Sequence, residues 1–144
     1  MIQSHSKSVT ITLTESEISS LTAIQMVQAD SCGAIVSFIG NVRNVDHGKQ
    51  VSHLTYEIHP QTESILLQVV NEVASRHEVA KVAVAHRYGE IPVGESAFIV
   101  SVSAEHRGEA FNACTEIVDE VKAKIPIWKH QVFADGTDEW VNCA

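Results

Sequence analysis

The chain has 144 residues, 44% of them hydrophobic, and a formal net charge of −8 at pH 7. This length and apolar content fit one globular domain over residues 1–144 with a hydrophobic core. The negative charge excludes the basic footprint of a nucleic-acid-binding protein, and no apolar run reaches the roughly 20 residues that span a bilayer.

Cysteine and histidine usage predicts a reduced, cytoplasmic protein. The three cysteines, Cys32, Cys114 and Cys143, form no CxxC pair, so we expect neither a disulfide framework nor a zinc site. The eight histidines form no HExxH or comparable ligand pattern. The N-terminus lacks the basic segment and apolar stretch of a signal peptide. We therefore expect no metal and no cofactor.

The N-terminal third predicts a strand, a helix and a second strand. Apolar and polar side chains alternate over 9–13, as in a strand. Thr14 and Glu17 form a capping-box pattern, which predicts a helix from there to about Gln28. The apolar stretch 33–40 predicts a buried strand.

The next segments predict a loop, a strand and a helix. Residues 45–50 contain Asp and Gly and predict a mobile loop. Alternation resumes over 51–58 and predicts a strand. His59 and Pro60 predict the start of a second helix, since Pro fits a first helical turn, and this helix ends near His77.

The following region predicts two strands and a long helix. Residues 79–88 form a strand pattern, and the turn-rich segment 89–94 leads to 97–104, which is almost entirely apolar or small and predicts a central strand. A third helix is expected from Arg107 to Lys122. The residues expected to face the core from this helix are Ala110, Phe111, Cys114, Ile117, Val118 and Val121.

The C-terminal region predicts a hairpin. Pro126 prevents continuation of the third helix, residues 127–133 predict a strand, Asp135 and Gly136 a turn, and 139–141 a last short strand. Helices interleaved with strands predict an α/β (α+β) two-layer sandwich, in which about three helices cover a mixed, largely antiparallel sheet.

Two basic residues, His106 and Arg107, stand where a strand passes into the third helix. The free amides and partial positive charge of a helix N-terminus stabilise an anion, and an arginine fork suits phosphate or carboxylate. The dipeptide alone favours the alternative, a surface pair that binds nothing.

Two lysines flank the end of the same helix. Lys122 compensates the helix dipole in the ordinary way, but Pro126 turns the chain back and brings Lys129, with Trp128 as an expected apolar wall beside it. A lysine desolvated near another cation becomes usable as a base or nucleophile. Arg43 follows a predicted strand and precedes the predicted loop, a common position for a ligand-binding residue.

Four segments together resemble the large, catalytic subunit of molybdopterin synthase. They are GAIVSFIGNVRN, HRYGEIPVGE, SAEHRGEAF and VKAKIPIWKH, and the similarity covers roughly Gly33 to Val141. The resemblance implies a hammerhead-like fold and a sulfurtransferase. Its reaction moves sulfur from the thiocarboxylated Gly-Gly tail of a small ubiquitin-like subunit to cyclic pyranopterin monophosphate, giving the molybdopterin dithiolene for molybdenum cofactor biosynthesis.

The resemblance also implies roles for the matching residues. Lys122 and Lys129 are the expected catalytic lysines, with Lys122 close to the partner's tail, and Arg43, His106 and Arg107 are expected to bind the pterin phosphate. A phosphate-bearing substrate requires such cations, and sulfur attack requires a nearby oxyanion stabiliser and proton donor.

The length of the third helix predicts a homodimer. Fifteen residues from Arg107 to Lys122 span about 22 Å of helix, so one small pterin cannot touch both ends. We therefore expect His106 and Arg107 of one subunit to complete the lysine site of the other, at the centre of a heterotetramer with two small subunits.

The sequence ends at Cys143 and Ala144, where relatives commonly continue with a basic tail, and His130 is a candidate to replace a contact from that tail. Three other functions are compatible with the residues alone. They are a scaffold that binds the tail or the pterin without turnover, a small-molecule sensor with a regulatory anion site, and a structural domain in which both lysines are dispensable.

Overall fold

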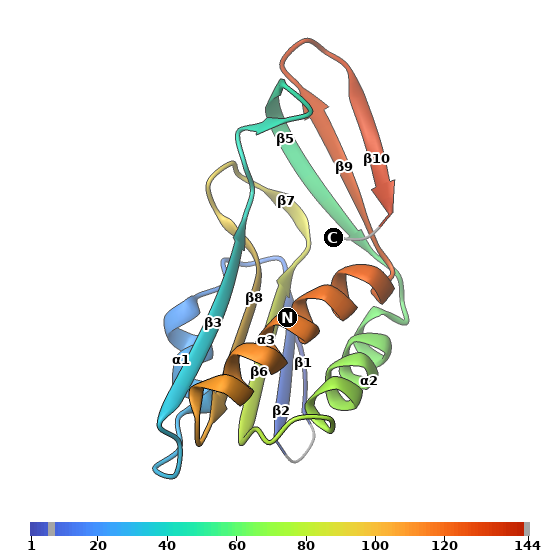
Figure 1. The fold of residues 1–144 in the computed structure, drawn as a ribbon. Coiled ribbons are helices and arrows are strands. Elements are labelled where there is room, and N and C mark those ends of the chain that lie inside the picture. Colours follow the sequence, from blue (N-terminus) through green and yellow to red (C-terminus); the bar gives the residue numbers. More distant parts are fainter. Residues whose placement is uncertain (6–7, 143–144) are drawn as a thin grey trace.

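The computed structural model describes residues 1–5 and 8–142 as two β-sheets and three helices (Figure 1). The strands are β1 (Ile2–His5), β2 (Val9–Thr14), β3 (Ala34–Asn41), β4 (Val45–Asp46), β5 (Lys49–Ile58), β6 (Lys81–Arg87), β7 (Gly89–Ile91), β8 (Ser96–Ala104), β9 (Ile127–Phe133) and β10 (Asp138–Asn142). The helices are α1 (Ser20–Val27), α2 (Thr62–Ala74) and α3 (Arg107–Lys124). Cys143, one of the three predicted free cysteines, lies outside the described residues.

The first sheet has five strands in the order β1-β2-β6-β8-β3, and only the β2–β6 pair is parallel. The second sheet has the order β10-β9-β5-β4, with β7 also paired to β5. Figure 1 shows the second sheet standing beyond one end of the first, where the C-terminal end of α3 leads into β9. The predicted α+β class with three helices and a mixed, largely antiparallel sheet is confirmed.

Helices cover both faces of the first sheet, which adds a layer to the predicted sandwich. Along β8, Val100 joins the main core with α2 and α3, whereas the preceding residue, Ile99, packs with Ala23 and Val27 of α1 on the other face. Residues of a strand alternate between faces. A strand covered on both faces is therefore apolar throughout, which explains the run over 97–104.

The predicted buried strand around 33–40 is instead an edge strand. β3 pairs only with β8, and its burial alternates along its length. Val36 and Phe38 pack against the main core, while Ile35 and Ile39 are exposed. A run of apolar residues does not by itself distinguish a central strand from an edge strand with an uncovered face.

The predicted capping box at Thr14 is wrong. α1 begins six residues later, and the Ser19 hydroxyl accepts a hydrogen bond from the Thr22 amide at 3.4 Å. Thr14 remains in β2 because it pairs with Arg87 of β6. Pairing between distant segments thus overrides the local pattern.

The predicted mobile loop at 45–50 is also wrong. Its residues form the tight hairpin of β4 and β5, in which Asp46 pairs with Lys49. His47 and Gly48 have φ values of 51° and 73°, the left-handed conformations that a two-residue hairpin turn requires.

Other differences lie at element boundaries and on one helix face. β1 and β7 were not predicted, and α2 begins at Thr62 instead of His59. Phe111 was expected in the core but is 56% exposed, and Ala113 is buried in its place. No helix within residues 1–5 and 8–142 is both long and apolar enough to cross a membrane.

The hairpin turn gives a test of this backbone geometry. Gly48→Ala should lower the free energy of unfolding by about 1 kcal/mol, because an L side chain disfavours the left-handed conformation; an added Cβ meets no atom within 4 Å, so steric contact adds nothing. Denaturant unfolding measures the difference.

Gly108→Ala is the matched control. Gly108 lies in the first turn of α3, and a Cβ there also meets no atom within 4 Å. Because alanine is the better helix former, this change should stabilise the protein by about 0.5–1 kcal/mol. Equal destabilisation by both substitutions would contradict the turn geometry.

Candidate active site

Two lysines lie where the second sheet meets the end of α3. Lys122 projects from the last turns of α3, and its Nζ atom lies 6.0 Å from the centre of the Phe98 ring in β8. Lys129 lies in β9 directly opposite Tyr56 of β5. Because directly opposed residues of an antiparallel pair point to the same face, the Lys129 and Tyr56 side chains share the inner face of the second sheet.

Three rings connect these two positions. The His86 ring in β6 stacks on Phe98, with ring centres 5.3 Å apart and an interplanar angle of 28°. Tyr56 meets the same imidazole edge-on at 5.2 Å and 89°. Lys122, which lies over Phe98, and Lys129, which lies opposite Tyr56, therefore both border one packed group, Tyr56–His86–Phe98, which we call the ring group.

The imidazole at the centre of the ring group is neutral. His86 is completely buried, and its Nδ1 lies 2.8 Å from the Arg87 carbonyl oxygen. A carbonyl oxygen only accepts, so Nδ1 carries the proton. Within the described part of the chain, Nε2 has no hydrogen-bond partner. Burial lowers the pKa of His86 to about 4, although the backbone hydrogen bond opposes this, and the positive charge of Lys122 lowers the pKa further.

Arg43 and Lys129 meet at one carboxylate, that of Asp46. Arg43 Nη2 lies 3.2 Å from Asp46 Oδ1, and Lys129 Nζ lies 3.9 Å from Oδ2. The Gln131 amide donates to the same Oδ2 at 2.6 Å and to Glu139 Oε1 at 2.8 Å. β4, β9 and β10 therefore contribute to one charged cluster beside the ring group.

Asp46 is ionised in this cluster. The Gln131 hydrogen bond lowers the pKa of the Asp46 carboxyl most strongly, partial burial opposes it, and the charges of His47, Lys129 and Arg43 lower it further. A carboxylate that accepts hydrogen bonds and faces cations favours its charged form. At neutral pH the cluster thus contains an anion between two basic residues.

The same cluster includes the one group among the described residues whose ligand atoms are spaced for a metal. Oxygens of Asp46 and Glu139 and a ring nitrogen of His47 lie within 4.8 Å of one another. Gln131 already donates to both carboxylates, and two cationic side chains face Asp46. Positive charge is therefore supplied here by the chain itself.

His106 and Arg107 lie at the other end of α3. His106 is the N-cap residue, makes no side-chain capping bond and is 83% exposed. α3 is one continuous helix, so about 22 Å of helix separates Arg107 from Lys122. Within one chain, the structure brings Arg43 to Lys129 but does not bring His106 or Arg107 to either lysine.

Trp128 and His130 do not belong to this site. They flank Lys129 in β9 and therefore point to the outer face of the sheet. Trp128 is 47% exposed there, and His130 stacks on Trp140 at 4.4 Å and pairs with Asp138 at 2.9 Å. The prediction of Trp128 as a wall beside Lys129 is wrong, because neighbours in a strand face opposite sides.

Sequence reasoning missed several residues of this region. Gln131 could have been found, because it follows Lys129 by two residues in a predicted strand and so shares its face. Asp46 was hidden by the prediction of a loop. Tyr56 and His86 join the site only through pairing between segments distant in sequence, which the sequence does not display.

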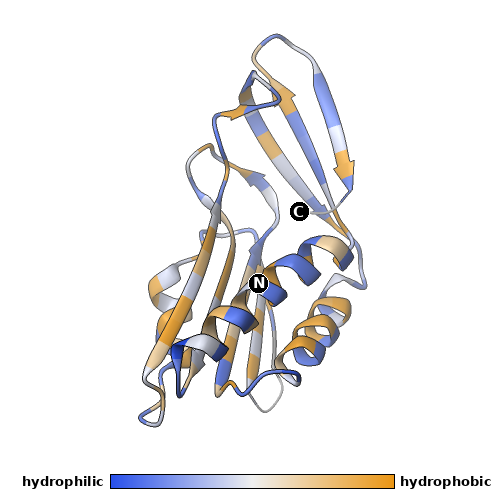
Figure 2. Ribbon diagram, viewed as in Figure 1, coloured by the Kyte–Doolittle hydropathy of each residue, from blue (hydrophilic) through white to orange (hydrophobic). Residues whose placement is uncertain are grey.

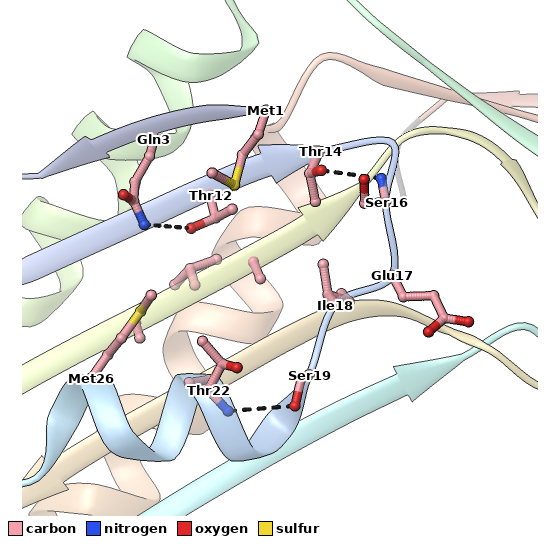
Figure 3. Close-up of a pocket in the computed structure, with 14 residues that line it drawn as sticks. Met1, Gln3, Thr12, Thr14, Ser16, Glu17, Ile18, Ser19, Thr22 and Met26 are labelled. Carbon is pink, nitrogen blue, oxygen red and sulfur yellow. Dashed lines mark hydrogen bonds between the residues drawn. The ribbon is translucent and has the colours of Figure 1, made fainter.

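A separate cavity of about 470 Å³ lies between α1 and the strands β1, β2 and β6 (Figure 3). Met1, Ile18 and Met26 are among its lining residues, and Glu17 supplies the one charged side chain. It contains no lysine, arginine or histidine. The hydropathy colouring shows both apolar and polar residues along the strands of the first sheet (Figure 2), and none of the side chains that line the cavity is cationic.

Comparison with known proteins identifies relatives of the chain. The model of the MoaE protein family matches residues 13–124. A protein of Pyrococcus abyssi named molybdopterin synthase catalytic subunit is 41% identical over 120 residues, covering 83% of this chain and 80% of the relative.

Solved structures share the fold. The structure of molybdopterin synthase from Staphylococcus aureus superposes with a TM-score of 0.84 and 26% identity, covering 91% of this chain and 96% of that chain. A complex of subunits 1 and 2 of the molybdopterin-converting factor from Helicobacter pylori superposes with a TM-score of 0.71 and 18% identity, covering 92% and 88%. The second likeness concerns the fold alone.

The buried imidazole predicts a pH dependence of stability. An unfolded chain protonates His86 near pH 6.5, whereas the folded chain resists protonation until about pH 4. The stabilisation is fully present above pH 6.5 and is lost as the pH falls to 4. The loss attributable to His86 should be about 3 kcal/mol, measured by denaturant unfolding at several pH values.

His86→Phe is the matched variant, because it keeps a ring between Tyr56 and Phe98 but cannot titrate. Its free energy of unfolding should fall by about 3 kcal/mol less than that of the parent between pH 6.5 and 4. Parallel pH curves for parent and variant would show that His86 does not cause the fall.

Proposed function

The chain belongs to the MoaE family, which includes molybdopterin synthase catalytic subunits, and on this premise we propose the reaction that its site performs. Sulfur passes from the thiocarboxylated C-terminus of a small ubiquitin-like subunit to cyclic pyranopterin monophosphate and gives the molybdopterin dithiolene. The observation that carries the proposal is the meeting of Lys122, Lys129 and Arg43 around one ring group and one carboxylate.

The two lysines serve the transfer of sulfur. When the thiocarboxylate sulfur attacks the substrate, negative charge develops on an oxygen atom of the reacting groups. Fixed cations in a site with little water stabilise such charge. Lys122 lies against an aromatic ring, and only 21% of the Lys129 side chain is exposed. We assign Lys122 to the end of the site that receives the partner's tail and Lys129 to the pterin.

Arg43 serves the substrate phosphate. A guanidinium can bind phosphate through two parallel hydrogen bonds, and 76% of the Arg43 side chain is exposed and thus accessible to a ligand. Its contact with Asp46 places it next to Lys129, so one substrate can reach both side chains.

His106 and Arg107 contribute from a second copy of the chain. The length of α3 separates them from Lys122 by about 22 Å, yet they stand exposed at a helix N-terminus, where an anion is stabilised. In a symmetric dimer each subunit supplies the same surface to the other. The active assembly is then a homodimer that carries one small subunit at each end, a heterotetramer.

The central lysine can be tested in a reconstituted assay with thiocarboxylated small subunit and cyclic pyranopterin monophosphate. Lys122→Ala should lower the rate of dithiolene formation by about 100-fold or more, the usual contribution of a positioned acid–base or charge-stabilising group. The amount of product is measured through its dithiolene, which binds metal.

Lys124→Ala is the control for this assay. Lys124 lies on the same final turns of α3, but its ammonium pairs with Glu120 at 2.7 Å. Its replacement should leave the rate within about twofold of the parent, since exposed ion pairs contribute little. Equal losses in the two variants would remove Lys122 from its role, and no product from the parent would overturn the proposed function.

Mixing two inactive variants tests the shared site. Lys122→Ala and Arg107→Ala chains should each be impaired as homodimers. A mixed dimer has one site with both defects and one intact site, so equal mixing should restore about a quarter of the parental rate. Absence of recovery, with mixed dimers verified by mass spectrometry, would show that each site is built from one chain.

A further inference from the structure

Asp46 has no role in the reaction proposed above, yet it contacts two of the residues assigned to that reaction. Arg43 Nη2 lies 3.2 Å from its Oδ1 atom, and Lys129 Nζ lies 3.9 Å from its Oδ2 atom. Resting on the proposed function, we propose that Asp46 is a positioning residue: its carboxylate holds the Arg43 guanidinium and the Lys129 ammonium side by side, so that Arg43 meets the phosphate and Lys129 the pterin of one substrate.

The carboxylate is itself held in place from two directions. Asp46 sits next to the two-residue turn of the β4–β5 hairpin, so its backbone is fixed by pairing with Lys49. From the opposite side, the Gln131 amide donates to Oδ2 at 2.6 Å. A side chain fixed at both its backbone and its carboxylate can orient its neighbours.

Gln131 is fixed in turn. It is 2% exposed, and its amide nitrogen donates to Glu139 as well as to Asp46. Glu139 lies directly opposite Gln131 in the β9–β10 register. The support behind Asp46 therefore runs across β9 to β10 and consists of groups that the substrate does not need to touch.

The Asp46 carboxylate orients Arg43 and Lys129 but adds little to the stability of the fold. Arg43 is largely exposed, and an exposed ion pair contributes only about 0–1 kcal/mol to stability. Without a shared anion, the two cations repel each other and their long side chains spread into solvent. A substrate that finds both cations already oriented avoids the loss of their side-chain freedom on binding.

The test compares steady-state kinetics of the parent with those of Asp46→Asn, in the presence of excess thiocarboxylated small subunit. Asparagine keeps the shape and can still accept from Gln131, but it carries no charge. The KM for cyclic pyranopterin monophosphate should rise about tenfold, with a smaller fall in kcat, because orientation of binding groups is lost.

A double-mutant comparison separates positioning from a general structural effect. If Asp46 acts through Arg43 and Lys129, then adding Asp46→Asn to Arg43→Ala should raise KM by clearly less than the tenfold seen in the parent. A purely structural effect would raise KM by the same factor in both backgrounds, and that result would overturn the inference.

Asp135→Asn is the matched control. Asp135 lies in the β9–β10 turn and pairs with Lys49 at 3.3 Å, so its replacement removes the same charge from a neighbouring hairpin. Its KM and kcat should equal those of the parent. The same values for Asp46→Asn would overturn this inference while leaving the proposed function intact. If the parent itself forms no product, both the proposed function and the role of Asp46 are overturned.

Discussion

The antiparallel pairing of β5 with β9 is the contact on which the site depends. It sets Lys129 opposite Tyr56 and Gln131 opposite Leu54, so the lysine and its supporting amide share the inner face. A shift of this register by one residue would exchange the two faces of β9. Trp128 and His130 would then point inward, and Lys129 would leave the ring group. Burial of Ile127 and Phe133 on the same inner face opposes that shift, because both would become exposed.

α3 joins the two halves of the molecule and also divides the basic residues. Its buried side, with Ala113, Ile117 and Val121, packs against the first sheet and α2, while its last turns carry Lys122 to the ring group. The rigidity of one continuous helix keeps His106 and Arg107 away from that end. The same element that places one catalytic candidate therefore requires a second subunit if both ends of the helix are to serve one substrate.

The electrostatics of the site differ from those of the chain as a whole. The protein is acidic, with a formal net charge of −8, yet Arg43, Lys122 and Lys129 gather where the two sheets meet. The carboxylates of Asp46 and Glu139 offset the positive charges of this region. The imidazole of His86 remains neutral because it is buried. A further cation in the ring group would repel Lys122. Burial thus keeps the His86 imidazole neutral, and the Asp46 carboxylate lies between Arg43 and Lys129.

The sequence by itself determined the local features of this protein. Alternation and runs of apolar residues located most strands, the apolar stripe located α3, and Pro126 marked the turn back into β9. The basic residues and the family resemblance selected Arg43, Lys122 and Lys129 as site residues. Only the tertiary structure decided which residues surround them. Asp46 lies in a hairpin because Val45 and Asp46 find partners in β5, and Thr14 stays extended because β6 pairs with it. The Tyr56 ring meets His86, which lies 30 residues further along the chain, and His86 meets Phe98, which lies 12 residues further still. Such contacts arise from burial and strand pairing between distant segments, and these leave no mark in local sequence patterns.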